Sequence, residues 1–405
     1  KEATTEQERD AARADLAKWQ ANREEGLRAL QERTEALAKA QAEEPARTRR
    51  LEAAQAALAV ARDAELAAAR DVLADVDGLL SGSALDARLA ACAVIARATP
   101  QGLAEYAQQG AEQRARVDQL LDDPAMMLRM LEAGGARDGR FAQALEIYSA
   151  IEGARSADAA AHPILDRLAL GTALAHARPI AQRNAAIDVD APRTVDPVKR
   201  YQNYEKAYLN GELDPAFASM SAWECGMIVN SYAPDHIHAW ARDMLRNYRP
   251  DHVFNPDYGW RYTGIVRTDI TYRHSYLYSD SDALQFFPNI LKNGGICGRR
   301  AFFGRFITKA FGLPTWGVAQ HAHAAVGRWT PHGWVVNFGA GWDKSWGPPE
   351  ETEPGRRGTD FVLEAEAREN AVAFRKALRA EWVAEALGEA RYVSTRPGSG
   401  GFWSN

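Results

Sequence analysis

Three short segments in the second half of the chain carry residue types that together could perform thiol chemistry. Cys297 follows Gly294 and Gly295, where a sharp turn can deliver the chain into a helix. His323 lies in the next predicted strand, and Asn337 interrupts the apolar run after it. A thiol is a good nucleophile when a helix N-terminus and an imidazole favour the thiolate, and the imidazole needs an orienting partner. This order of residues indicates a thiol hydrolase or acyltransferase.

The sequence around these residues predicts the elements that must position them. An apolar stripe at spacings of three and four follows Cys297 as far as Phe311 and predicts a helix that stops at Gly312. Thr315 to Trp329 is predicted to form a strand, and a turn leads into a second strand, Trp334 to Phe338. The predicted fold class is therefore α+β, with a cysteine-bearing helix packed on an antiparallel sheet.

The base and its orienting partner each have an alternative. On one strand His321 and His323 would point to the same face about 7 Å apart, so only one can touch the sulfur. We assign His323, because small residues follow it and allow a helix to lie close. Asn337 needs a hydrogen bond, since a buried amide without one costs about 1–3 kcal/mol, and the histidine ring is the economical partner. Asp343 is the competing orienting residue.

These motifs resemble those of the transglutaminase-like superfamily of cysteine enzymes, which have a papain-like fold. The resemblance is confined to about residues 260–350, under a quarter of the chain. It implies that Cys297 is the nucleophile, His323 the general base and Asn337 the orienting group, although most members have Asp at the last position. The matching segments are Gly295-Ile296-Cys297, Phe302 to Phe311, Gly312-Leu313-Pro314, His323-Ala324 and Trp334-Val335-Val336-Asn337.

Further residues are candidates for contacts with a substrate. The backbone amide of Cys297 would form one half of an oxyanion hole, and the resemblance implies the indole of Trp260 as a second donor. Arg299 and Arg300 follow the cysteine closely enough to bind an anionic group. Tyr272 and Trp316 belong to an aromatic-rich segment that can line a cleft. The alternative for the aromatic residues is that they pack in the core. The alternative for Arg299 and Arg300 is that they lie on a solvated face of the helix.

The remainder of the chain is predicted to be helical. The first 75 residues are rich in Ala, Glu, Arg and Leu at helical spacing, and Pro45 interrupts them, which favours a helical hairpin or a coiled coil. Self-association through these helices is a further expectation. The predicted parts are a hairpin or coiled coil over 1–75, a helical domain over 76–257, the transglutaminase-like core over 258–350, and a C-terminal helix with a flexible tail over 351–405.

Composition narrows the classes of partner and compartment. A formal charge of −5 and a pI near 6.1 give no basic field that would attract nucleic acid. The sequence has no run of eighteen apolar residues, so we expect no membrane-spanning helix in it. Three cysteines are too few for a zinc site or a disulfide framework, and we expect no metal or organic cofactor. A bond between Cys225 and Cys297 would remove the nucleophile. The first residue is Lys, so a secreted or periplasmic protein after signal removal is one expectation.

Three functions are compatible with these patterns. The first is a thiol enzyme that cleaves or transfers an amide or acyl group of a peptide or glycan-linked substrate. The second is a carbohydrate-active or carbohydrate-binding protein that uses the aromatic residues as stacking platforms for an acidic polysaccharide. The third is a non-catalytic interaction protein in which the core is degenerate and the N-terminal helices mediate assembly.

Overall fold

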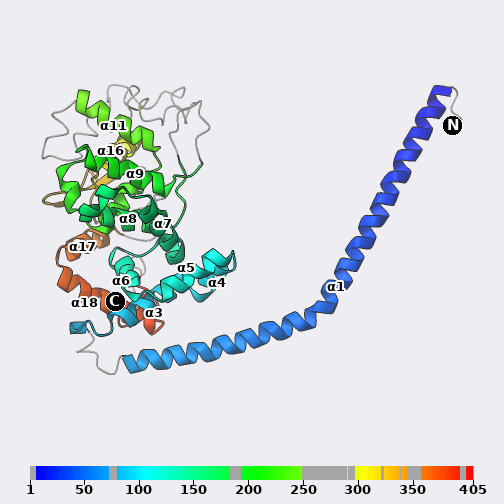
Figure 1. The fold of residues 1–405 in the computed structure, drawn as a ribbon, viewed down its shortest axis with the longest axis horizontal. Helices are drawn as coiled ribbons and strands as arrows, with labels where there is room; N and C mark the ends of the chain where they lie inside the picture. Colours follow the sequence, from blue (N-terminus) through cyan, green and yellow to red (C-terminus); the bar gives the residue numbers. More distant parts are fainter. Residues whose placement is uncertain are drawn as a thin grey trace. The chain divides into compact units, whose positions relative to one another are not determined.

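The computed structural model describes residues 6–72, 80–182, 193–248, 290, 297–320, 323–337, 339–343, 357–392 and 398–404. The chain forms two compact units, Lys1–Asp71 and Val72–Asn405. Helices dominate and one small antiparallel sheet accompanies them, which confirms the general α+β class (Figure 1). The helices of the second unit are α3 (Asp86–Ala98), α4 (Pro100–Ala107), α5 (Ala111–Leu121), α6 (Pro124–Glu132), α7 (Phe141–Ala154), α8 (Pro163–His176), α9 (Pro197–Leu209), α10 (Ala222–Val229), α11 (Asp235–Tyr248), α16 (Cys297–Ala310), α17 (Gly358–Glu369) and α18 (Ala371–Ala386).

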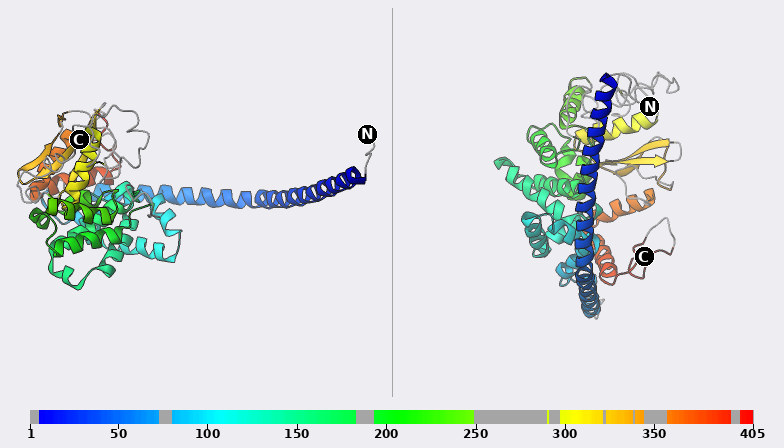
Figure 2. Two further views of the ribbon diagram at one scale, coloured as in Figure 1. Left: turned by 90° about the horizontal axis from the view of Figure 1, so that it is seen from above. Right: turned by 90° about the vertical axis from the view of Figure 1, so that its right-hand side faces the viewer.

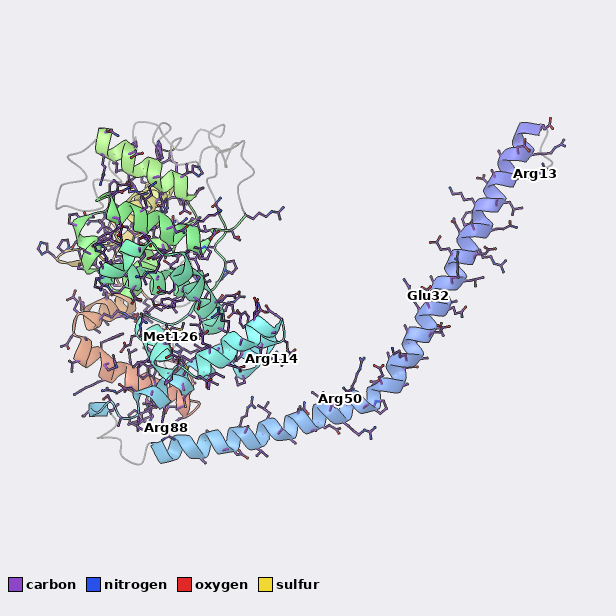
Figure 3. All side chains as sticks on the ribbon, in the orientation of Figure 1. Arg13, Glu32, Arg50, Arg88, Arg114 and Met126 are labelled. Carbon is purple, nitrogen blue, oxygen red and sulfur yellow. The ribbon has the colours of Figure 1, made fainter. Side chains whose placement is uncertain are left out.

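The first unit consists of one long helix, α1 (Glu6–Val72). The expected helical hairpin is wrong, because the chain stays helical through Pro45. A proline inside a helix removes one backbone hydrogen bond and bends the helix without reversing it. The ribbon bends near the labelled Arg50 (Figure 3). A coiled coil with another helix remains a prediction.

The core of the second unit is a layer of helices centred on α8. This helix packs against α7, α9 and α10, and its residue Leu168 lies in one apolar cluster with Tyr201 and Phe217. At the other end of the unit α18 docks on α3 (Figure 1). The guanidinium of Arg379 donates to both carboxylate oxygens of Asp86, at 2.6 and 2.8 Å. This paired contact joins the C-terminal helices to the start of the helical layer.

The sheet contains the strands β1 (Thr315–Gln320), β2 (His323–Thr330) and β3 (Gly333–Val336), in that order and antiparallel. The expected single strand from 315 to 329 is therefore wrong, because Gln320 pairs with His323 and the chain reverses between them. The sequence gives no turn signal there, since His321-Ala322 contains none of the Gly, Pro, Asn or Asp residues that usually mark a reversal. The turn from β2 into the following strand is confirmed.

Helices cover both faces of this sheet (Figure 2). Helix α16 lies on one face: a methyl group at Gly317 would stand 2.5 Å from Nη1 of Arg305, and the Thr315 hydroxyl is 3.5 Å from the Arg305 carbonyl oxygen. Helices α10 and α17 lie on the other face, where Val318 and Ala325 form a cluster with Met227 and Phe361. Residues of β1 and β2 thus alternate between α16 and the α10–α17 side.

Candidate active site

Cys297 is the first residue of α16 and is partly exposed. None of the three cysteines forms a disulfide, so the pairing of Cys225 with Cys297 that would remove the nucleophile is absent. Cys225 is fully buried, and burial, with the charge of Glu224, raises the pKa of its thiol. The first amides of a helix have no partner within the helix and favour negative charge beside them. Cys297 therefore lies at the start of a helix, as the sequence predicts.

The far end of α16 is fixed by a glycine, as expected from the sequence. Gly312 has a φ of 79°, and its N–H donates to the Lys309 carbonyl oxygen. The Leu313 N–H donates to the carbonyl oxygen of Thr308, which completes a common helix-ending motif. A side chain at Gly312 would also strike the buried ring of Phe217, at 2.7 Å. This stop sets where the chain turns back into β1.

The connection from α16 to β1 brings Cys297 and His323 to the same end of the helix–sheet layer. Arg305 lies beside Thr315 and Gly317, and Cys297 is about 12 Å further toward the helix start at 1.5 Å per residue. Along β1, the distance from Gly317 to the last residue, the partner of His323, is about 10 Å at 3.3 Å per residue. Measured from Thr315, whose hydroxyl lies at the Arg305 carbonyl oxygen, the same stretch of β1 is about 17 Å long, so the start of α16 and the start of β2 lie toward the same end of the layer.

The alternation of side chains along β2 places His323 relative to α16. Alternation from the pair Val318 and Ala325 assigns His323 to the α10–α17 face, opposite the face that α16 covers. A His323 ring would therefore have to reach the sulfur around the end of the sheet. His321, the alternate base, lies outside the described residues.

Asn337 is not beside His323. Its N–H donates to the Val326 carbonyl oxygen at 2.9 Å, and Val326 is three residues from His323, about 10 Å along β2. The Asn337 Nδ2 atom is buried and has no hydrogen-bond partner among the described residues, so the specific bond expected of this amide is not found there. Asp343, the competing orienting residue, is exposed.

The other candidate residues have separate outcomes. Arg300 is half-buried in α16; Arg299 is in the same helix, but its side chain is outside the described part. Trp316 stacks on the buried ring of Phe361, with ring centroids 5.0 Å apart. Because the Trp316 indole belongs to this core cluster, its stacking face is already occupied by protein. Trp260 and Tyr272 lie outside the described residues.

A buried polar network that the sequence did not reveal anchors the C-terminal end of α16. The Tyr204 hydroxyl donates to the Lys309 carbonyl oxygen at 2.9 Å, and Arg242 Nη1 donates to that of Ala310 at 3.1 Å. The Lys309 ammonium in turn donates to the carbonyl oxygen of Asn230. Cationic groups near the last carbonyls of a helix are favourable. The network thus holds α16 in place and, through it, Cys297.

The same network contains a serine–histidine pair. Ser231 Oγ lies 3.1 Å from His238 Nε2, and His238 Nδ1 lies 3.0 Å from the Tyr204 oxygen. Because the Tyr204 hydroxyl donates elsewhere, we assign the proton to His238 Nδ1 and a Ser231 donor bond to Nε2. Both side chains are buried, Ser231 at 5% and His238 at 0% exposure. The pair therefore braces the protein interior, and no sequence motif signals its seven-residue spacing.

Two buried neutral histidines predict acid sensitivity. Burial, then the charge of Arg200, lowers the pKa of His176 to about 3, and burial with the charges of Arg200, Arg242 and Lys309 lowers the pKa of His238. Below about pH 6.5 the unfolded chain binds protons at these residues and the folded chain does not. The free energy of unfolding should therefore fall by about 1.4 kcal/mol per pH unit for each histidine as the pH drops.

Urea unfolding between pH 7 and pH 5 measures this slope. We expect His176→Gln to reduce this slope by about 1.4 kcal/mol per pH unit, the contribution of one bound proton. This change in slope is expected whatever the substitution does to the free energy of unfolding at pH 7. The matched control is His332→Gln, which removes a histidine whose side chain is exposed. Equal slopes for both variants would contradict the assignment.

The fold and site define a mostly helical α+β chain in which a cysteine-headed helix packs on a three-stranded antiparallel sheet. No family model matches the chain, and no curated protein or solved structure was found to be similar to it. Within the described residues, no helix has both the length and the apolar character needed to cross a membrane. The same residues contain no group of three His, Cys, Asp or Glu side chains that could hold a metal ion.

Proposed function

We propose that this chain is a thiol-dependent enzyme that cleaves or transfers an amide or acyl group, on a transglutaminase-like core. The observation that carries the proposal is the unbridged, partly exposed thiol of Cys297 at the first position of α16. Two further features support it. The start of α16 and the start of β2 lie toward the same end of the helix–sheet layer, and α16 is anchored at its other end. A peptide or a glycan-linked amide is the proposed substrate class.

The proposed reaction proceeds in two balanced steps. The Cys297 sulfur attacks the carbonyl carbon of the amide, and an imidazole takes the thiol proton and gives it to the leaving amine. The backbone N–H of Cys297 donates to the oxyanion that forms. Water or a second amine then attacks the thioester carbonyl and gives a proton to the imidazole, which passes it to the sulfur as the carbon–sulfur bond breaks and the acid or the new amide leaves. The chemistry uses no redox step.

The choice between the two histidines decides how the site is built. His323 is the assigned base, but strand alternation directs it away from the face that α16 covers, so we test both rings. Replacing the base with Gln should lower turnover by about 10²–10⁴-fold, the usual contribution of acid–base catalysis. Replacing the other histidine should change turnover by less than about threefold.

The assay measures ammonia or amine released from amide-bearing peptides and peptidoglycan fragments by His323→Gln, His321→Gln and the unmodified chain. His332→Gln is the matched control, because this exposed histidine lies in the turn between β2 and β3. Full turnover in both single variants and in the double variant would overturn an imidazole-assisted mechanism.

A further inference from the structure

Helix α1 carries a row of exposed leucines. Leu16, Leu30, Leu37, Leu51 and Leu58 are separated by multiples of seven residues and are between 42% and 62% exposed. Side chains project from α1 along its length, including those of Arg13, Glu32 and Arg50 (Figure 3). A row at sevenfold spacing stays on one side of a helix that pairs with another helix, which is the seam of a coiled coil.

The second position of this seam, three residues further along the helix, holds four small residues and three large ones: Gly26, Ala40, Ala54 and Ala61, and Trp19, Arg33 and Arg47. Ala40, Ala54 and Ala61 follow Leu37, Leu51 and Leu58 in this way. Together the two positions give the alternating spacing of three and four that a seam requires. Pro45 falls on neither position, so the bend in α1 does not place a proline in the contact.

The charged residues in the seam discriminate between directions of pairing. Arg23 and Glu44 occupy the leucine register, and Arg33 and Arg47 occupy the other position. In a parallel pair in register each of these four residues would face its own copy, which gives four layers of like charge. Like charges in close contact are destabilising, and more so when partly desolvated. The sequence therefore disfavours the parallel arrangement.

An antiparallel pair removes every one of these conflicts. We take the register in which residue 38 of one copy faces residue 39 of the other. In this register Glu44 of each copy faces Arg33 of the other, so the dimer contains two layers of opposite charge. In the same register Leu16 faces Ala61, Leu37 faces Ala40 and Leu51 faces Gly26, whereas Leu30 faces Arg47 and Leu58 faces Trp19. A large side chain opposite a small one lets two helices approach closely. The midpoint of this register is the midpoint of α1 itself, so the whole helix takes part.

We propose that α1 pairs with α1 of a second copy of this chain as an antiparallel coiled coil, with a two-fold axis between Ala38 and Lys39. The opposite-charge layer of Glu44 and Arg33, and a register in which no charged seam residue faces a like charge, identify this same helix as the occupant of the exposed face. The pairing is an isologous contact and closes as a dimer. It is independent of the thiol chemistry proposed above.

The first test is the mass of the full chain in solution by sedimentation equilibrium. The dimer has twice the 44.5 kDa of one chain. We expect Leu37→Lys with Leu51→Lys to give the mass of a single chain, because both residues lie in the seam. The matched control is Val60→Lys, since Val60 is 70% exposed on α1 but off the seam, and it should remain dimeric. A single-chain mass for the unmodified protein at tens of micromolar, or an unchanged dimer in the double variant, would overturn the proposal.

The second test fixes the direction of pairing. We expect Glu44→Arg to weaken the dimer and Glu44→Arg with Arg33→Glu to restore it, because the exchanged charges face each other again in the antiparallel register. Oxidation of a mixture of the Leu16→Cys and Ala61→Cys proteins should join residue 16 to residue 61, identified by peptide mass spectrometry. Bonds that join residue 16 to its own copy would contradict the antiparallel arrangement.

Discussion

Replacing Cys297 with Ala should abolish amide turnover, with a loss of at least about 10³-fold, because the nucleophile cannot be replaced by a group that only positions water. The structure leaves this thiol unbridged and partly exposed at a helix start. The substitution removes one sulfur atom and keeps the helix, so folding should be unaffected. Turnover of amide-bearing peptides and the free energy of unfolding are to be measured on the same preparation.

Cys92→Ala provides the matched control for this loss. Cys92 is a half-buried residue of α3, in the helical layer, and is predicted to be a packing residue. The control should retain turnover within about twofold. Retained turnover in Cys297→Ala would show that the reaction does not use this thiol. The carbohydrate hypothesis would then replace the thiol hypothesis.

Replacing Arg200 with Met should destabilise the protein by about 3–5 kcal/mol, a large part of the free energy of unfolding of a typical domain. Arg200 is fully buried in α9. Its guanidinium donates to the carbonyl oxygens of Val229, Ser231 and Ala233 and to the Asp235 carboxylate. Methionine preserves most of the volume but leaves these acceptors without their donor. Urea unfolding at pH 7 provides the measurement.

The neighbouring residue supplies the control for this prediction. Lys199 belongs to the same helix and is exposed, so Lys199→Met should change the free energy of unfolding by less than about 0.5 kcal/mol. A loss below about 1 kcal/mol in Arg200→Met would mean that water replaces the guanidinium at these carbonyls.

The elements of the candidate site that obey local rules could be predicted from the sequence. The cysteine-headed helix and its end at Gly312 followed from the apolar stripe and from the left-handed backbone that only glycine adopts easily. The turn at Gly333, which joins β2 to β3, carried the usual signal. In these places the local preference of the residues agrees with the structure that the whole chain adopts. These elements could therefore be predicted from one sequence.

Features that depend on pairing across the chain were not predictable in this way. The sequence between Gln320 and His323 lacks turn residues, and the pairing of these two residues puts His323 at the start of a second strand. The register between β2 and β3 places Asn337 opposite Val326, a relation that the order of residues does not contain. The network of Tyr204, His238 and Lys309 joins residues 34 and 105 positions apart. Such contacts become visible only when the packing of the helices is known.

Reaction of the native protein with a thiol-directed electrophile across pH tests the central claim most directly. Cys92 and Cys225 serve as internal standards, because Cys92 is partly exposed, as Cys297 is, and Cys225 is buried. Peptide mass spectrometry follows each site separately. We expect Cys297 to react at pH 6 at least about tenfold faster than Cys92, as an activated thiolate does. A rate at Cys297 no higher than that of Cys92 at every pH would contradict a nucleophilic role for this residue.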